Sequence, residues 1–155
     1  MRFIIRRMPP FALLAALVAL AAFASAACSN DKDASSTNVE VLNAINILDK
    51  AGLHDLDTAI ANKTIAANAT TTYQQLQTIV LVTEWPNSDL KAKAKTLAAV
   101  FGDASSATAG ATPDQAKAST AAHNAHEAEH DFSHEVWDYL YGKAGIKVSD
   151  SGDND

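Results

Sequence analysis

Sulfur-containing and guanidinium side chains are scarce in this chain of 155 residues. The single cysteine is Cys28, the two methionines are Met1 and Met8, and arginine occurs only at positions 2, 6 and 7. One cysteine cannot form an intramolecular disulfide, so an exported chain has no disulfide use for it. A chain without arginine beyond position 7 also lacks the bidentate phosphate contacts that are typical of nucleic-acid-binding proteins.

The first 27 residues have the pattern of a secretory signal peptide. Three arginines are followed by an uncharged run over 8–28 that is rich in Ala, Leu and Val. Pro9 and Pro10 interrupt this run, which leaves it short for a membrane-spanning helix of about 20 residues. We therefore expect residues 1–27 to be removed. A retained membrane anchor and a twin-arginine signal at Arg6-Arg7 are the alternatives.

The end of this segment, Ser25-Ala26-Ala27-Cys28, resembles the lipobox of bacterial lipoproteins, in which a cysteine after small residues becomes the lipidated first residue. The family usually has Leu three residues before the cysteine, where this chain has Ser25. The resemblance implies a chain anchored to a membrane of the bacterial cell envelope through acylated Cys28. Ordinary cleavage after Ala26, which would release a soluble secreted domain, is the alternative.

The mature chain is strongly acidic. Three of the twelve basic residues are the arginines of the signal, so nine Lys remain beside eighteen Asp and Glu, and the net charge becomes 9 − 18 = −9. This balance disfavours nucleic acid and anionic lipid headgroups as partners. Without methionine, and with its cysteine acylated, the mature chain must build any metal site from imidazole and carboxylate groups.

Hydrophobic periodicity predicts an all-α fold, an antiparallel bundle of about four helices over residues 37–145. No segment combines sustained strand alternation with turn residues. Residues 28–36 are expected to form a disordered tether, and residues 146–155 an acidic disordered tail.

Start and stop signals divide the bundle. A capping box from Thr37 to Glu40 begins the first helix, which Gly52 ends. A long second helix with a break or kink expected at Thr70, Thr71 and Thr72 ends before Trp85-Pro86. Gly102 ends the third helix, a linker follows over 103–112, and Thr112 caps the fourth. The expected helices cover 38–51, 55–84, 89–101 and about 113–141.

The fourth of these helices carries four of the five histidines: His123, His126, His130 and His134. At about 100° per residue they fall within one arc of about 80°. The residues of the expected core face lie nearly opposite, at Ala118, Ala121, Ala125, Ala128, Phe132, Val136 and Tyr139. The histidine stripe therefore lies on a flank of the helix, which Trp137 and Tyr141 continue.

One-turn histidine pairs can chelate a divalent ion, so the stripe, with Glu127, predicts a transition-metal site. Zn, Cu(II), Ni or Fe suits these donors. One straight helix supplies only two or three ligands, so another helix, a protein partner or a second copy of the chain must complete the site. His54 is expected to lie too far along the bundle, and a solvent-facing histidine row without a metal is the alternative.

The segment His126-Glu127-Ala128-Glu129-His130 resembles the HExxH motif of zincin metalloproteases. The resemblance implies His126 and His130 as zinc ligands and Glu127 as general base. Charged Glu129 inside the motif, the lack of a third histidine after a glycine, and the lack of an edge strand for a peptide substrate depart from that family. We therefore do not expect a protease.

These observations lead to one hypothesis and one alternative. The hypothesis is an extracytoplasmic, lipid-anchored helical protein that binds a divalent metal ion through its histidine stripe for buffering, delivery or sensing. The alternative is a metal-independent structural or interaction domain, which uses the flank at Trp137 and Tyr141 against another protein.

Overall fold

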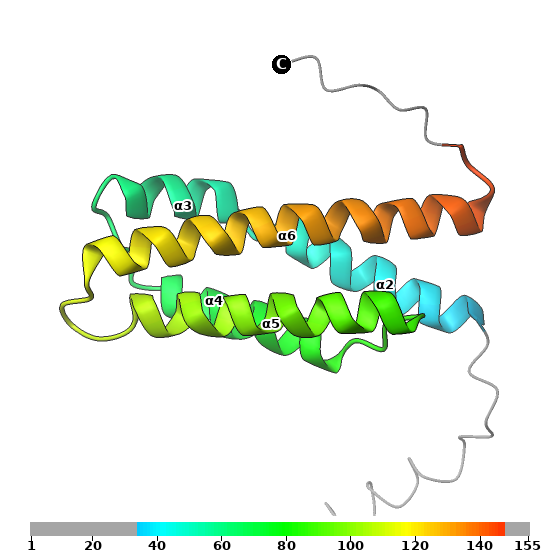
Figure 1. Ribbon diagram of the computed structural model, residues 1–155, viewed down its shortest axis with the longest axis horizontal. Coiled ribbons are helices and arrows are strands. Elements are labelled where there is room, and N and C mark those ends of the chain that lie inside the picture. Colours follow the sequence, from blue (N-terminus) through cyan, green and yellow to red (C-terminus); the bar gives the residue numbers. More distant parts are fainter. Residues whose placement is uncertain (1–33, 148–155) are drawn as a thin grey trace, which may run out of the picture. The chain divides into compact units, whose positions relative to one another are not determined.

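A computed structural model describes residues 34–147 of the chain (Figure 1). The expected signal peptide, Cys28 and the tail beyond residue 147 lie outside the described residues. Of the expected tether 28–36, only residues 34–36 are described, and these belong to the first helix.

The described part is all-α, as the sequence predicts, with no strand in residues 34–147. The helices pack against one another as a bundle in which α6 contacts α5, α3 and α2, while α4 pairs with α5 (Figure 1). Five helices follow in order: α2 (Ala34–Asp49), α3 (Leu53–Ala61), α4 (Ala69–Val82), α5 (Ser88–Thr108) and α6 (Gln115–Ala144).

The expected single helix over 55–84 is wrong, because the chain breaks at 62–68 into α3 and α4. Lys63 adopts a positive φ of 63° just after α3 ends. The threonines at 70–72 do not interrupt a helix, because they lie in the first turn of α4. The continuous apolar pattern arises because α3 faces α6 while α4 faces α5, so each helix has its own core contacts.

Two helices run past their expected ends at glycine. Gly102 lies inside α5, and a Cβ added to it would lie 2.6 Å from Nε2 of Gln77 on α4. This glycine therefore permits the close approach of α4 and α5, where Gln77 Nε2 donates to the Ala98 carbonyl oxygen at 2.9 Å. Gly142 likewise lies inside α6, which ends at Gly145 with a φ of 70°.

The caps at helix starts also differ from the sequence prediction. Helix α2 begins at Ala34, which places Thr37 inside it rather than at its cap. At α6 the cap is Asp114, whose carboxylate accepts from the backbone N–H groups of Ala116 and Lys117. Asp114 replaces Thr112 because α5 extends to Thr108 and shortens the connection. Asn87 caps α5, where its side-chain oxygen accepts from the backbone N–H of Leu90.

A continuous apolar core joins the five helices, with Tyr73 and Phe101 as its largest fully buried side chains. Trp85 closes one end of this core, with its indole N–H donating to the Val80 carbonyl oxygen and its ring edge-on to Phe132 at 4.8 Å. The Tyr73 hydroxyl is buried and has no hydrogen-bond partner among the described residues. Burial, with a smaller contribution from the charge of Asp57, raises the pKa of Tyr73 to about 12.

Replacing Tyr73 by Phe is therefore expected to stabilise the bundle. The substitution removes a buried hydroxyl without a partner and keeps the ring contact with Phe101. We expect the free energy of unfolding in urea to rise by about 1 kcal/mol. As a control, Tyr139→Phe removes a hydroxyl that is 3.4 Å from Asn38 Oδ1 and should give no gain. A loss of stability in Tyr73→Phe would contradict the assignment of an unsatisfied hydroxyl.

Candidate metal site

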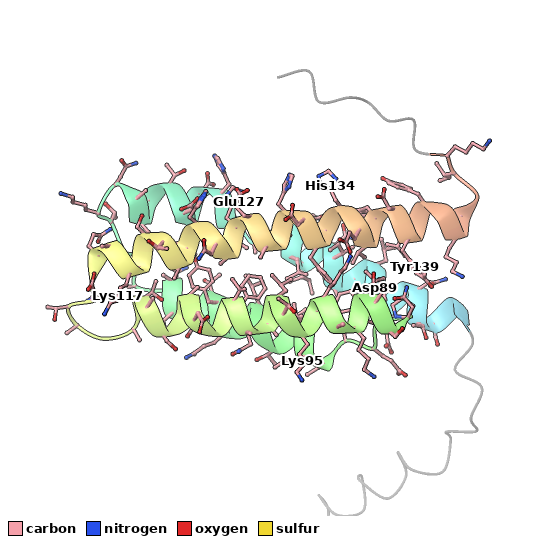
Figure 2. All side chains as sticks on the ribbon, in the orientation of Figure 1. Asp89, Lys95, Lys117, Glu127, His134 and Tyr139 are labelled. Carbon is pink, nitrogen blue, oxygen red and sulfur yellow. The ribbon has the colours of Figure 1, made fainter. Side chains whose placement is uncertain are left out.

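The histidines of α6 line one edge of the helix, at the border of the buried face. His123 and His126 both contact α3 through their side chains. The side chain of His126 is 21% exposed, and that of His123 is 62% exposed. His130 and His134 are exposed and their rings lie 4.6 Å apart. Figure 2 shows Glu127 and His134 along the same edge of α6, on the side away from α5.

The buried face of α6 lies closer to the histidines than the sequence predicts. Ala121, Ala128 and Tyr139 are only partly buried, while Glu129 and Ser133 are buried. The remaining expected core residues, Ala118, Ala125, Phe132 and Val136, are buried as predicted. Because α2 and α3 pack on the histidine side of α6, the buried arc is rotated toward His126.

Helix α3 brings two further donors to the stripe. The rings of His54 and His126 lie edge to face with their centroids 5.2 Å apart, so the expectation that His54 lies elsewhere is wrong. The two helices run antiparallel, because Gln115 at the start of α6 donates its side-chain N–H to the Ile60 carbonyl oxygen at the end of α3. The first turn of α3 therefore lies beside the middle of α6.

Asp57, which the sequence analysis missed, contacts two of the histidines. Its Oδ2 lies 3.2 Å from Nδ1 of His123 and 3.4 Å from Nδ1 of His126. In a tetrahedral zinc site with bonds of about 2.0–2.1 Å, neighbouring ligand atoms are about 3.3 Å apart. Both distances therefore match edges of such a site. The three side chains Asp57, His123 and His126 are called the outer cluster below.

No three His, Cys, Asp or Glu side chains in residues 34–147 are already arranged to hold a metal ion. In the outer cluster, two of the three ligand–ligand edges have a suitable length. The side chain of His123 is 62% exposed, so its rotation is not blocked by the core. The geometry is thus that of converging donors rather than of a closed site.

Beside the outer cluster, a groove of about 520 Å³ runs along α6 between α2 and α3. We call it the histidine groove. Its walls combine imidazole, carboxylate and aromatic groups. It is lined by Leu48, Asp49, Gly52, Leu53, His54, His126, Glu129, His130, Ser133, His134, Trp137, Asp138 and Tyr141.

A buried polar network underlies the groove. The Ser133 hydroxyl lies 2.8 Å from Asp49 Oδ1 and 2.6 Å from Glu129 Oε1, and the Trp137 indole N–H donates to Asp49 Oδ2 at 2.9 Å. A hydroxyl has one hydrogen and cannot satisfy two carboxylates. Burial, with a smaller contribution from the charge of Asp49, raises the pKa of Glu129. The raised pKa favours a proton on Glu129, which would supply the second hydrogen that these two contacts of Ser133 need.

The sequence contained a signal for Glu129 but none for Asp57. Glu129 falls in the same helical arc as Ala125 and Val136, so a carboxyl among apolar positions was visible in the projection. Asp57 is recognisable only once α3 is separate and antiparallel to α6. Glu127, by contrast, is exposed, with Oε1 3.9 Å from Nδ1 of His126.

The aromatic flank is part of the groove wall. The Trp137 and Tyr141 rings stack with centroids 5.7 Å apart. The indole hydrogen bond to Asp49 ties Trp137 to α2. This flank therefore contributes to packing between α2 and α6.

Comparisons with protein-family models, with curated proteins and with solved structures give no match to this chain. In the described residues, no helix has the length and apolar character needed to cross a membrane.

The Glu129→Gln variant is expected to be more stable at neutral pH. Because the pKa of Glu129 is raised in the fold, its contribution to stability is present below the pKa of the unfolded chain and is lost as the pH rises through the folded pKa. Glutamine keeps a donor toward Ser133 and removes this titration. Urea unfolding at pH 4 and pH 7 should show a gain of about 1 kcal/mol at pH 7 and a smaller one at pH 4.

The matched control is Glu127→Gln, which changes an exposed carboxyl two residues away. It should leave the pH dependence of unfolding unchanged. Equal pH dependence in Glu129→Gln and the parent chain would contradict a raised pKa of Glu129.

Proposed function

We propose that this chain is an extracytoplasmic, lipid-anchored helical protein that binds a divalent transition-metal ion beside its histidine groove. The supporting observation is that Asp57 of α3 contacts both His123 and His126 of α6. Sequence positions 57 and 123 are 66 residues apart, so only the packing of α3 on α6 brings these donors together.

The donor chemistry supports borderline divalent ions. Imidazole and carboxylate suit Zn, Cu(II), Ni and Fe(II), whereas Cu(I) prefers the sulfur ligands that the mature chain lacks. His54, against the ring of His126, is the nearest candidate for a further ligand. Because these donors come from α3 and α6 of one chain, the proposal requires no second copy and no protein partner.

The exposure of the donors supports buffering, delivery or sensing over a structural role. Structural zinc sites are closed by four protein ligands and contribute directly to folding. Here the bundle has a continuous apolar core, and His123, His130 and His134 are exposed. An ion held at such an edge can exchange with other carriers.

Metal titration of the mature domain tests this function. We expect isothermal titration with Zn²⁺, Cu²⁺ and Ni²⁺ to give micromolar or tighter binding of at least one ion. Asp57→Asn should weaken that binding at least about tenfold, because it removes the carboxylate that joins the two histidines. Its control is Asp55→Asn, an exposed carboxylate on the same helix, which should bind like the parent.

Two results would contradict metal binding through this cluster. One is millimolar affinity for every ion, which would favour the metal-independent interaction domain. The other is equal affinity in Asp57→Asn and Asp55→Asn. Glu127→Gln tests the predicted carboxylate ligand separately, and a loss comparable to that of Asp57→Asn would include Glu127 in the donor set.

The lipid anchor has its own test. Expressed with its native signal in a bacterium fed radioactive palmitate, the chain should incorporate label and partition with membranes, because the lipobox-like segment ends at Cys28. Cys28→Ala should lose the label. Persistent labelling of Cys28→Ala, or an unlabelled parent chain, would contradict acylation at this residue.

A further inference from the structure

The large hydrophobic side chains that remain exposed are concentrated on two helices. Seven are exposed in the described residues, and five of these belong to α2 and the last turn of α4. We call these five the outer apolar face: Val39 (54% exposed), Leu42 (38%), Ile47 (49%), Leu81 (60%) and Val82 (74%).

Helix α2 carries exposed hydrophobic side chains in addition to its buried apolar stripe. Its core stripe of Val41, Ile45 and Leu48 is fully buried. On the helical wheel, Val39 lies opposite this stripe, beside the polar Asn43, Asn46 and Lys50, while Leu42 and Ile47 lie on its two flanks. A helix that meets protein on one side and only water on the other normally carries polar residues on its outer face.

Val39 near the start of α2 and Leu81 and Val82 at the end of α4 lie toward the same end of the bundle, whereas Ile47 lies in the last turn of α2. Helix α2 begins at the end where α4 finishes (Figure 1). Between the two helices runs a groove of about 720 Å³ whose apolar lining includes Ile47, Leu76 and Ile79. Asn43, Asn46, Lys50, Thr72 and Gln75 also line this groove, so its surface is mixed.

The length of the segment between Cys28 and α2 bears on which partner covers the outer apolar face. Only residues 29–33 separate Cys28 from the start of α2 at Ala34. At a maximum of about 3.6 Å per residue, the six steps from Cys28 to Ala34 span about 20 Å at most. An acylated Cys28 would therefore keep the first turns of α2 within about 20 Å of the bilayer surface.

We propose that the outer apolar face docks on the surface of the bilayer that holds acylated Cys28, an inference that rests on the proposed lipid anchor. The anchor confines the domain near the membrane, so even weak contacts are populated. The net charge of −9 points to apolar burial rather than headgroup charge as the source of contact. Docking should therefore occur on neutral phosphatidylcholine.

This orientation would leave the histidine groove in water. The residues of α2 that border the groove are Leu48 and Asp49. They follow Ile47 directly in the sequence but lie on other sides of the helix, where Asp49 is bonded to Ser133 and Trp137 of α6. An ion could then reach the histidines while the start of α2 rests on lipid.

The scarcity of cysteine makes the proposal directly testable. Residues 1–27 are replaced by a strong bacterial lipoprotein leader, so that Cys28 is acylated whatever the native signal does. Val82→Cys then supplies the only free thiol and is labelled with the environment-sensitive dye NBD. The matched control is Ala111→Cys, an exposed position in the α5–α6 connection at the other end of the bundle.

In phosphatidylcholine vesicles, we expect the dye at position 82 to shift its emission to the blue and brighten at least about twofold. Lipids with spin labels near the headgroup should quench it, while the dye at position 111 should do neither. The dye on Val39→Cys, in α2, should show the same emission shift and quenching as the dye on Val82→Cys. Agreement between the two positions would exclude a local effect of one substitution.

Equal spectra at positions 82 and 111 would overturn the docking. So would a shift at position 82 that occurs without vesicles and grows with protein concentration, because a second copy would then cover the face. The palmitate experiment stays separate. If the native chain takes up no palmitate but the dye at position 82 of the acylated form still shifts on vesicles, only the anchor is refuted. If the native chain takes up palmitate but the dye at position 82 does not shift, only the docking is refuted.

Discussion

The packing of α6 against three neighbours is the constraint on which the rest of the structure depends. Its buried arc is built largely from small residues, among them Ala118, Ala122 and Ala125. Small side chains let neighbouring helices approach closely but bury little apolar area each. The arc must therefore be long and wide, and it extends to Glu129 and Ser133. The histidines consequently lie at the border of the buried face.

Because the chain breaks between α3 and α4, the histidines of α6 are joined by Asp57 of α3 in the outer cluster. If residues 55–84 formed one helix, its first turns could not pack separately on α6. The turn at 62–68 reverses the chain, so that α3 lies antiparallel to α6 and α4 lies on α5. A helix of nine residues has little stability by itself. The docking of α3 by Leu53 and Ile60 therefore decides whether Asp57 reaches the histidines.

Sequence reasoning was right where a feature is local and wrong where it depends on a neighbour. Gly52 has the left-handed conformation that its place after an apolar stripe predicts, and the helical class follows from periodicity. Gly102 was misread, because its role is to make room for Gln77, which is 25 positions away. The apolar periodicity of residues 55–84 is present in the sequence, but no local signal indicates that α3 and α4 face different helices. His54 was placed wrongly for the same reason, since its distance from His126 depends on the direction of α3.

The buried network beneath the histidine groove gives a reason to seek function there. Glu129 is the only carboxyl, amino or imidazole side chain among the buried residues of the described chain. A bundle that needed only to fold would be more stable with an apolar residue at that position, because burying a carboxyl is unfavourable even when Ser133 binds it. Departures of this kind from an otherwise consistent pattern are expected at functional sites. The buried carboxyl lies between His126 and His130 in the sequence and lines the same groove as these imidazoles.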